Sequence, residues 1–298
     1  MHTDLPPMSA WQDVPWRRVE RAIFKLQQRL YRASCRGDSA PVRQLQRLFI
    51  TSWYAKLLAA RRVPQDPRGK RTAGVDGVKA LPPPQRLRLA RPLHLPGPAQ
   101  PVRRVWIPKP HTEDHRPLGI PVRQDRARQA VATLALEPAW AATFAPNSYG
   151  FRPGRSGHEA MAALSPSINK PAKYVLEADI EKGCDRIKPQ ALLNQLPTFP
   201  TMRRAMHAWL KAGLMDGDPL CPPDTGGPQG AVRSPLRMNV ALHGLEPAVE
   251  RAFPVSKDRQ GGRPTVIRYA DDLVVLPRHR ETIAQAQQVV STGLQDRG

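Results

Sequence analysis

The chain has 298 residues, and its 46 Lys and Arg against 25 Asp and Glu give a formal net charge of +21. A positive surplus of this size requires a polyanionic partner, either nucleic acid or an anionic membrane surface. No apolar run approaches the ~18 residues of a membrane-spanning helix, and the N-terminus lacks a secretory pattern. Three scattered cysteines exclude a disulfide framework and argue against a zinc site. We therefore expect a cytoplasmic protein that binds nucleic acid rather than membrane.

Residues 1–64 are predicted to form a basic helical segment. Apolar residues recur at helical spacing over 16–36, and Gly37 should end that helix. A second helix should begin near Asp38 or Ser39. The segment holds twelve basic and four acidic residues, more than solubility requires, although a solvated basic face is the alternative. The residues predicted to contact RNA on the first helix are Arg17, Arg21, Lys25 and Arg29.

Residues 65–101 have the composition of a connecting region. The glycines of KRTAGVDG (70–77) predict a loop, and the prolines of LPPPQ (81–85) are expected to block a helix start. We therefore predict no regular element in this stretch.

From residue 102 to 298 the pattern changes to alternating strands and helices. Strands are predicted over 102–108, 116–121 and 173–180, and a hairpin over 265–277. Helices are predicted over 125–140, 188–196, 201–214, 234–252 and 281–294. This irregular alternation indicates an α+β fold with helices on one face of a split βαβ-type sheet.

Three carboxylates stand at predicted strand ends. Asp271 and Asp272 are adjacent at the tip of the hairpin, and Asp179 ends the strand at 173–180. Adjacent like charges repel unless a cation neutralises them, and carboxylates are ligands that Mg²⁺ prefers. If the two strands are neighbours, these side chains can hold two Mg²⁺ ions ~4 Å apart for phosphoryl chemistry. The alternative is three unrelated surface aspartates.

The hairpin carries a recognisable motif. YADD at Tyr269–Asp272 resembles the metal-binding hairpin of reverse transcriptases. Six further stretches, in the same order, resemble the reverse transcriptase/maturase proteins that bacterial group II introns encode. They are KRTAGVDGVKAL (70–81), VRRVWIPKP (102–110), RPLGIP (116–121), ALEPAW with PNSYGFRPGRS (135–156), YVLEADIEK (174–182) and GGPQGAVRSPL with NVALHGLE (226–246). The resemblance implies the fingers and palm of a right-hand polymerase at 102–298, preceded by a helical RNA-binding extension at 1–64.

The resemblance also implies roles for individual residues. Asp179, Asp271 and Asp272 match the catalytic metal ligands. Lys109 and Arg116 match the residues that hold the incoming triphosphate, which suits a mobile ammonium beside a planar guanidinium. The remaining matches are Gln229 and Gly230 beside the nucleotide and template, Arg152 and Arg155 along the template path, and Cys184 in the nucleotide site.

Cys184 departs from the family pattern, because relatives carry at that position a Phe that packs under the sugar and rejects a 2′-hydroxyl. Arg233 and Arg237 also stand where relatives have apolar or small residues. The family continues beyond the position that matches Gly298 with the last palm strands and a helical thumb, so we expect a truncated chain without a thumb. A separate polypeptide that supplies the thumb is then an expected partner.

Three functions remain open at this point. The first is an RNA-directed DNA polymerase that uses deoxynucleoside triphosphates, an RNA template and a DNA primer. The second is a maturase that binds group II intron RNA and assists splicing without polymerising. The third is an inactive truncated remnant, favoured by Cys184, Arg233 and Arg237.

Overall fold

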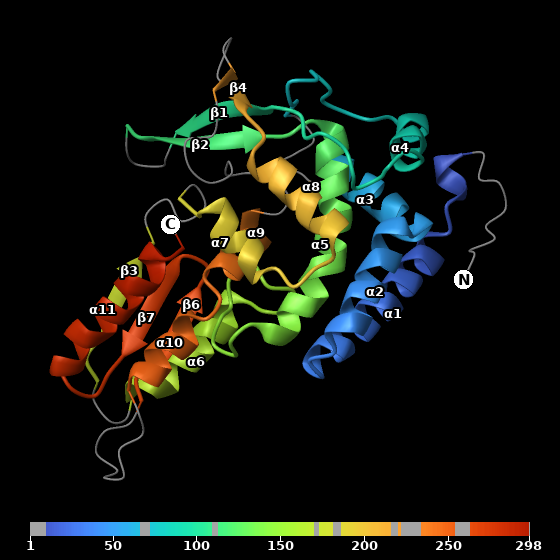
Figure 1. Ribbon diagram of the computed structural model, residues 1–298. Helices are drawn as coiled ribbons and strands as arrows, with labels where there is room; N and C mark the ends of the chain where they lie inside the picture. Colours follow the sequence, from blue (N-terminus) through green and yellow to red (C-terminus); the bar gives the residue numbers. More distant parts are fainter. Residues whose placement is uncertain are drawn as a thin grey trace. The chain divides into compact units, whose positions relative to one another are not determined.

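A computed structural model describes residues 10–65, 72–108, 113–169, 173–180, 186–215, 220–221, 234–253 and 263–297 (Figure 1). The chain forms two compact units, and each unit draws on two separate stretches of sequence. The first comprises Met1–Ala142 and Leu196–Ser234, and the second comprises Thr143–Gln195 and Pro235–Gly298. The predicted division at 64 and 101 follows sequence pattern rather than packing and stays a prediction.

The N-terminal half of the first unit is a helical cluster. Its elements are a 3₁₀ turn η1 (Trp11–Asp13), α1 (Trp16–Cys35), α2 (Ser39–Thr51), α3 (Trp53–Gln65) and α4 (Pro83–Ala90). The first two helices run side by side (Figure 1). Fully buried residues such as Val19, Leu30, Phe49 and Leu57 form their common core. Burial of these apolar side chains is the main stabilising contribution to the cluster.

Two predictions for these helices are confirmed and two details are wrong. The first helix ends before Gly37, which adopts a left-handed φ of +75°, and the second begins at Ser39. However, the second helix stops at Thr51, because Ser52 is extended (ψ 124°), so the chain starts a separate α3. The prolines at 82–84 also do not block a helix. Pro83 begins α4, where an absent N–H and a fixed φ are tolerated.

The glycine-rich loop packs onto the start of α5 (Arg123–Thr143). The carboxylate of Asp76 accepts hydrogen bonds from the backbone N–H groups of Val78 (3.3 Å) and Arg123 (3.0 Å). A Cβ at Gly74 would lie 2.9 Å from the carbonyl carbon of Pro121, so only glycine fits there. The loop therefore satisfies one orphan donor at the N-terminus of α5, the N–H of Arg123.

A four-stranded sheet with the order β2-β1-β4-β5 completes the first unit, together with α8 (Pro200–Leu210). Strands β1 (Val102–Pro108) and β2 (His115–Ile120) pair antiparallel, which confirms both predicted strands. The predicted helix at 201–214 is too long at its C-terminal end. Leu214–Met215 instead form β4, which pairs with β1 in parallel and with β5 (Leu220–Cys221) antiparallel.

The second unit is built on a three-stranded antiparallel sheet. The strands are β3 (Leu176–Asp179), β6 (Thr265–Tyr269) and β7 (Asp272–Leu276), in the order β3-β7-β6. Its helices are α6 (Gly157–Asn169), α7 (Pro189–Gln195), α9 (Ser234–Ala241), α10 (Leu245–Ala252) and α11 (Glu281–Gln295). The hairpin, the helix at 188–196 and the C-terminal helix are confirmed, whereas α6 had no counterpart among the predicted elements.

Helices cover both faces of this sheet, so the expectation of helices on one face is wrong. Val266 and Leu273 pack with Leu245 and Val290 from α10 and α11. Ile267, the residue after Val266, packs instead with Ala160 of α6. Consecutive strand residues point to opposite faces, and each face carries apolar residues that a helix covers.

The long helix predicted at 234–252 is also wrong. Gly244 has a φ of +91° and separates α9 from α10. Glycine adopts this left-handed conformation without the steric cost that a Cβ brings. Across the described part of the chain, no helix is both long and apolar enough to span a membrane.

Candidate active site

The hairpin between β6 and β7 has the tight geometry that the sequence predicts. Tyr269 pairs with Asp272, which leaves Ala270 and Asp271 as a two-residue loop. Ala270 has a φ of +60° and is 2% exposed, whereas the φ of Asp271 is not positive. A positive φ at the first loop position is typical of a type II′ turn, where glycine is usual. With alanine the turn carries strain of about 1–3 kcal/mol.

The third carboxylate lies directly across the sheet. Asp179 is the register partner of Asp272, and Ile180 N–H donates to the Asp271 carbonyl (3.3 Å). Hydrogen-bonded and non-hydrogen-bonded pairs alternate, so Asp179 and Asp272 form a non-hydrogen-bonded pair, the type whose side chains lie closer. Ala178 and Leu273 pack toward α10 and α11, so both aspartates project from the other face. The two strand ends are therefore neighbours, which is the condition that the sequence analysis set for a shared metal site.

The carboxylates repel one another. Burial raises the pKa of Asp272, and the carboxylates of Asp271, Asp179 and Glu177 raise it further. Like charges directly opposite on neighbouring strands destabilise a sheet unless something offsets them. The hairpin tip is therefore an acidic site at which a cation would relieve repulsion.

The donors fit a divalent metal that is open to substrate. Within the described ranges, no group of three or more His, Cys, Asp or Glu side chains is placed so that it could hold a metal ion without further ligands. Mg²⁺ is usually bound by one or two carboxylates plus substrate phosphates and water rather than by an all-protein cage. Paired aspartates at an exposed sheet end meet that requirement. The residues that would hold the ion are Asp179, Asp271 and Asp272.

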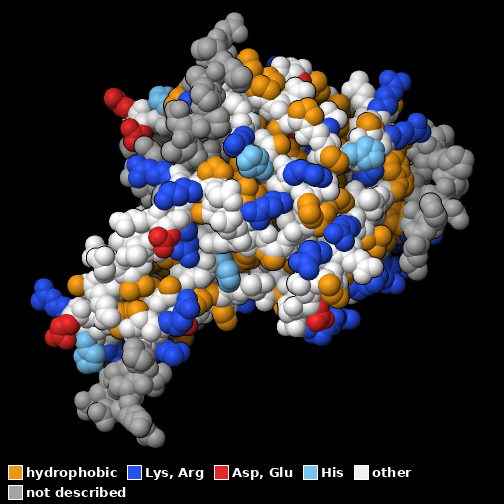
Figure 2. Space-filling model, in the orientation of Figure 1, with side chains coloured by type: hydrophobic (Ala, Val, Ile, Leu, Met, Phe, Trp, Pro, Cys, Tyr) orange, Lys and Arg blue, Asp and Glu red, His pale blue; other side chains and the backbone are white. Residues whose placement is uncertain are grey.

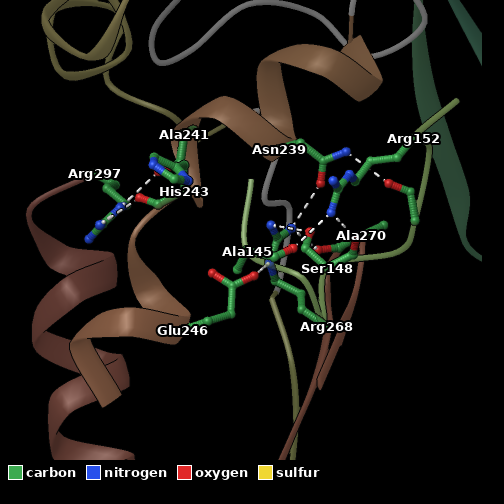
Figure 3. Close-up of polar contacts among 11 residues, drawn as sticks. Ala145, Ser148, Arg152, Asn239, Ala241, His243, Glu246, Arg268, Ala270 and Arg297 are labelled. Carbon is green, nitrogen blue, oxygen red and sulfur yellow. Dashed lines mark hydrogen bonds and ion pairs between the residues drawn. The ribbon is translucent and has the colours of Figure 1, made fainter. Parts of the chain in front are cut away.

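A buried polar cluster supports the turn, and the sequence analysis did not anticipate it (Figure 3). Arg268 is 1% exposed, and its guanidinium donates to four acceptors from separate parts of the second unit. The acceptors are Glu246 Oε1 (2.7 Å), Asn239 Oδ1 (2.9 Å), Ser148 Oγ (2.7 Å) and the Ala270 carbonyl (3.0 Å). The sequence signal for this cluster is Arg268 itself, a charged residue within an apolar strand directly before YADD.

Gly150 packs against the same turn from outside the hairpin. A Cβ at Gly150 would lie 2.4 Å from Ala270 N. The Gly150 carbonyl accepts a hydrogen bond from Asn239 Nδ2 (2.8 Å), and Asn239 is also a partner of Arg268. The YGF segment, the C-terminal half of α9 and the hairpin are thus joined by one set of contacts.

The two arginines predicted for the template path differ in exposure. Arg152 is 9% exposed, donates to the carbonyls of Ala145 (2.8 Å) and Ser148, and lies over the ring of Phe144. This burial argues against contact with RNA, and we do not propose Arg152 as an RNA ligand. Arg155 is exposed and lies over the ring of Tyr149.

Most residues predicted to hold the nucleotide lie outside the described residues. These are Lys109, Cys184, Gln229 and Gly230. For Arg116 the structure describes the backbone, which pairs with Ile107 in the β1–β2 ladder. Their roles stay predictions.

The predicted basic face of α1 is exposed. Arg17, Arg21, Lys25 and Arg29 are all exposed, and Figure 2 shows Lys and Arg side chains spread over the visible face with few acidic ones. A groove of about 590 Å³ lies between α1 and α2. Its lining includes four arginines and no acidic residue, namely Arg29, Arg32, Arg36 and Arg47.

Comparison with known protein families decides the identity of the fold. Residues 107–298 match the model of the reverse transcriptase (RNA-dependent DNA polymerase) family, and residues 11–93 match the N-terminal domain of reverse transcriptase. The chain belongs to the reverse transcriptase family. The matched residues 107–298 include the three-stranded sheet that carries the aspartates. The predicted α+β fingers and palm are confirmed.

Individual relatives refine the family. The chain is 30% identical to Protein YkfC of Escherichia coli (strain K12), over 89% of this chain and 78% of that protein. It is 35% identical to the group II intron-encoded protein LtrA of Lactococcus lactis subsp. cremoris, over 49% of this chain and 25% of LtrA. It is 32% identical to Maturase-like protein 1 of Euglena gracilis, over 80% of this chain and 52% of that protein.

These similarities confirm the predicted resemblance to intron-type reverse transcriptase/maturase proteins. The chain spans a quarter of LtrA and about half of the Euglena protein.

Proposed function

We propose that this reverse transcriptase adds deoxynucleotides to a DNA primer on an RNA template and also binds group II intron RNA as a maturase. The observation that carries the polymerase proposal is the placement of Asp179 directly opposite Asp272, beside Asp271 at the hairpin tip. A deoxynucleoside triphosphate is polyanionic, so the repelling carboxylates require cations before it can approach them.

The proposed chemistry is two-metal nucleotidyl transfer. Bound Mg²⁺ would lower the pKa of the primer 3′-hydroxyl and neutralise charge on the departing pyrophosphate. In this proposal Asp179 and Asp271 are direct ligands, and Asp272 is the less direct third carboxylate. Lys109 and Arg116 bind the triphosphate, which suits the fixed charge and planar donors of arginine.

We extend the proposal to three residues that the family motifs match. Gln229 and Gly230 border the nucleotide and the template. Cys184 occupies the position that faces the sugar, where a thiol leaves room that an aromatic ring would fill.

The test of the polymerase proposal is Asp271→Asn. The substitution removes a ligand charge with almost no change in size. Primer extension on an RNA template with Mg²⁺ should fall by at least about 100-fold, since metal stabilisation of the transition state is worth several kcal/mol. Binding of RNA should persist, because the hairpin carboxylate is not a phosphate ligand.

The matched control is Glu281→Gln, which removes an exposed carboxylate from the first turn of α11 in the same unit. Its primer extension should equal that of the unchanged chain. Undiminished synthesis by Asp271→Asn would overturn the catalytic assignment.

A maturase function without polymerisation is the second candidate, favoured by the exposed basic face of α1 and the arginine-lined groove. Arginine suits phosphate because its planar donors match two oxygens at once. Tight binding of group II intron RNA by a chain that extends no primer would support this candidate. A chain that neither extends primers nor binds intron RNA above non-specific affinity would support the inactive remnant.

A further inference from the structure

We propose that Arg268 is a positioning residue for the carboxylate hairpin and that its buried guanidinium sets the affinity of the aspartates for a divalent metal. This inference rests on the proposed function of the hairpin as a metal site. Arg268 itself touches neither substrate nor metal in this proposal. It acts through the turn that carries Asp271 and Asp272.

The hydrogen-bond donors of the Arg268 guanidinium point to acceptors inside the protein. Each nitrogen of its guanidinium has an acceptor among Glu246, Asn239, Ser148 and Ala270, at 2.7–3.0 Å. The acceptors lie up to 120 positions from Arg268 along the chain. A lysine has three donors on a single atom and cannot reproduce this planar arrangement.

The second step connects the guanidinium to the turn. The Ala270 carbonyl, which accepts from Arg268 Nη1, belongs to the peptide that leads into Asp271. Ala270 adopts a positive φ, a conformation that persists only when its surroundings over-determine it. Arg268 holds the carbonyl side of this residue, and Gly150 packs against its N–H side.

The third step concerns the aspartates. The Asp271 carbonyl accepts a hydrogen bond from the N–H of Ile180, the residue after β3, so both peptide groups around Asp271 are fixed. Repulsion among Asp179, Asp271 and Asp272 favours any motion that spreads them apart. A rigid turn resists that motion and keeps the carboxylates close enough to share a cation.

The fourth step is energetic. Burying an Arg–Glu pair is costly, and apolar residues of similar volume are often as stable or more stable. Glu246 is buried with Arg268 and forms an ion pair with it. The pair is neutral overall, so it does not offset the negative charge of the aspartates. A gain in stability therefore does not explain why an ion pair is buried behind the hairpin. The geometry that the ion pair imposes on the turn explains it.

The decisive experiment measures metal binding rather than polymerisation. Mn²⁺ affinity is determined by electron paramagnetic resonance on the full chain, with circular dichroism and urea unfolding to quantify the folded fraction. Arg268→Lys keeps the charge opposite Glu246 but loses the planar contacts. Per folded molecule, its Mn²⁺ affinity should fall about tenfold. In primer extension, kcat should fall and the Mg²⁺ requirement should rise, with KM for the nucleotide changed less than twofold.

A second variant separates positioning from folding. Arg268→Met combined with Glu246→Met replaces the ion pair by apolar side chains, so no buried charge is left without a partner. This double variant should also bind Mn²⁺ about tenfold more weakly. The matched control is Arg128→Met, which breaks the ion pair between half-buried Arg128 and buried Asp125 (3.2 Å) in the first unit. It should lower stability and leave Mn²⁺ affinity per folded molecule unchanged.

Each outcome decides the proposal. Mn²⁺ affinity within twofold of the unchanged chain in either folded Arg268 variant overturns it. So does a failure of the unchanged chain to bind Mn²⁺, or equal binding by Asp271→Asn. If the unchanged chain binds Mn²⁺ at the aspartates but extends no primer, the polymerase function fails. The Mn²⁺ comparison still decides the role of Arg268.

Discussion

At the scale of single residues, the strongest constraint beside the hairpin is Gly150. A Cβ there would lie 2.4 Å from Ala270 N, closer than such atoms approach one another in folded proteins. We predict that Gly150→Ala lowers the free energy of unfolding by about 1–3 kcal/mol, the range for overpacked interiors. Urea unfolding monitored by circular dichroism measures the change.

The control for this prediction is Gly157→Ala at the first residue of α6. The nearest atom to its added Cβ is Tyr269 Cε2 at 3.8 Å, an ordinary contact. Its free energy of unfolding should stay within about 0.5 kcal/mol of the unchanged chain, typical of surface substitutions. Equal effects at the two glycines would show that the close approach at Gly150 relaxes without cost.

The same scale shows which site residues a sequence can predict. Asp271 and Asp272 were predictable because adjacent carboxylates between two β-rich runs are a local pattern. The partners of Arg268 were not, because Glu246 and Asn239 lie 22 and 29 positions away and Ser148 lies 120 positions away. A buried ion pair between distant segments leaves no periodic signal in the chain.

At the scale of elements, α5 contains a carboxyl group whose titration should be visible in stability. Burial raises the pKa of Glu137, and the charge of Arg62 lowers it in part. The folded chain therefore retains this proton at a pH where the unfolded chain, with a pKa near ~4.3, has lost it. Stability from this group is present at low pH and is lost as pH rises from about 4.3 through the raised pKa.

We therefore predict that Glu137→Gln is more stable than the unchanged chain at pH 8 and that this advantage shrinks toward pH 4. Glutamine keeps the shape of the side chain and has no charge to bury. Urea unfolding of both proteins across this pH range measures the difference. An advantage that does not vary with pH would show that the carboxyl is not what destabilises the site.

The predicted boundaries of helices were wrong where one sequence signal is compatible with two different structures. Prolines interrupt helices, but they also begin them, and Pro83 does so in α4. The apolar run at 234–252 was continuous in composition, yet Gly244 turns the chain left-handed within it. Helices on the second face of the palm sheet were missed because α6 carries few large apolar residues to reveal its period.

At the scale of the whole molecule, the sequence order and the packing order differ. Residues 196–215 follow α7 of the second unit in sequence but belong to the first unit, where β4 pairs with β1. Pairing between distant segments is not encoded by local patterns, so the three-segment division of the sequence could not show it. Charge, in contrast, is additive along the chain and predictable from composition.

The surplus of +21 makes a prediction that distinguishes overall charge from specific contacts. Each phosphate neutralised on single-stranded RNA contributes a slope of about −0.7 in log affinity against log salt. If four α1 side chains bind phosphates, replacing all four by glutamine should reduce the slope magnitude by about 3. The residues are Arg17, Arg21, Lys25 and Arg29, all exposed on one helix.

The control removes the same charge from another part of the molecule. Arg251, Arg263, Arg278 and Arg280 are exposed in the second unit, and their replacement by glutamine also lowers the net charge by four. Intron RNA affinity is titrated at several salt concentrations for both quadruple variants. The slope magnitude of the α1 variant should fall by about 3, and that of the second-unit variant by less than about 1. Equal losses would mean that RNA responds to the overall field of the protein and that α1 is not a specific binding face.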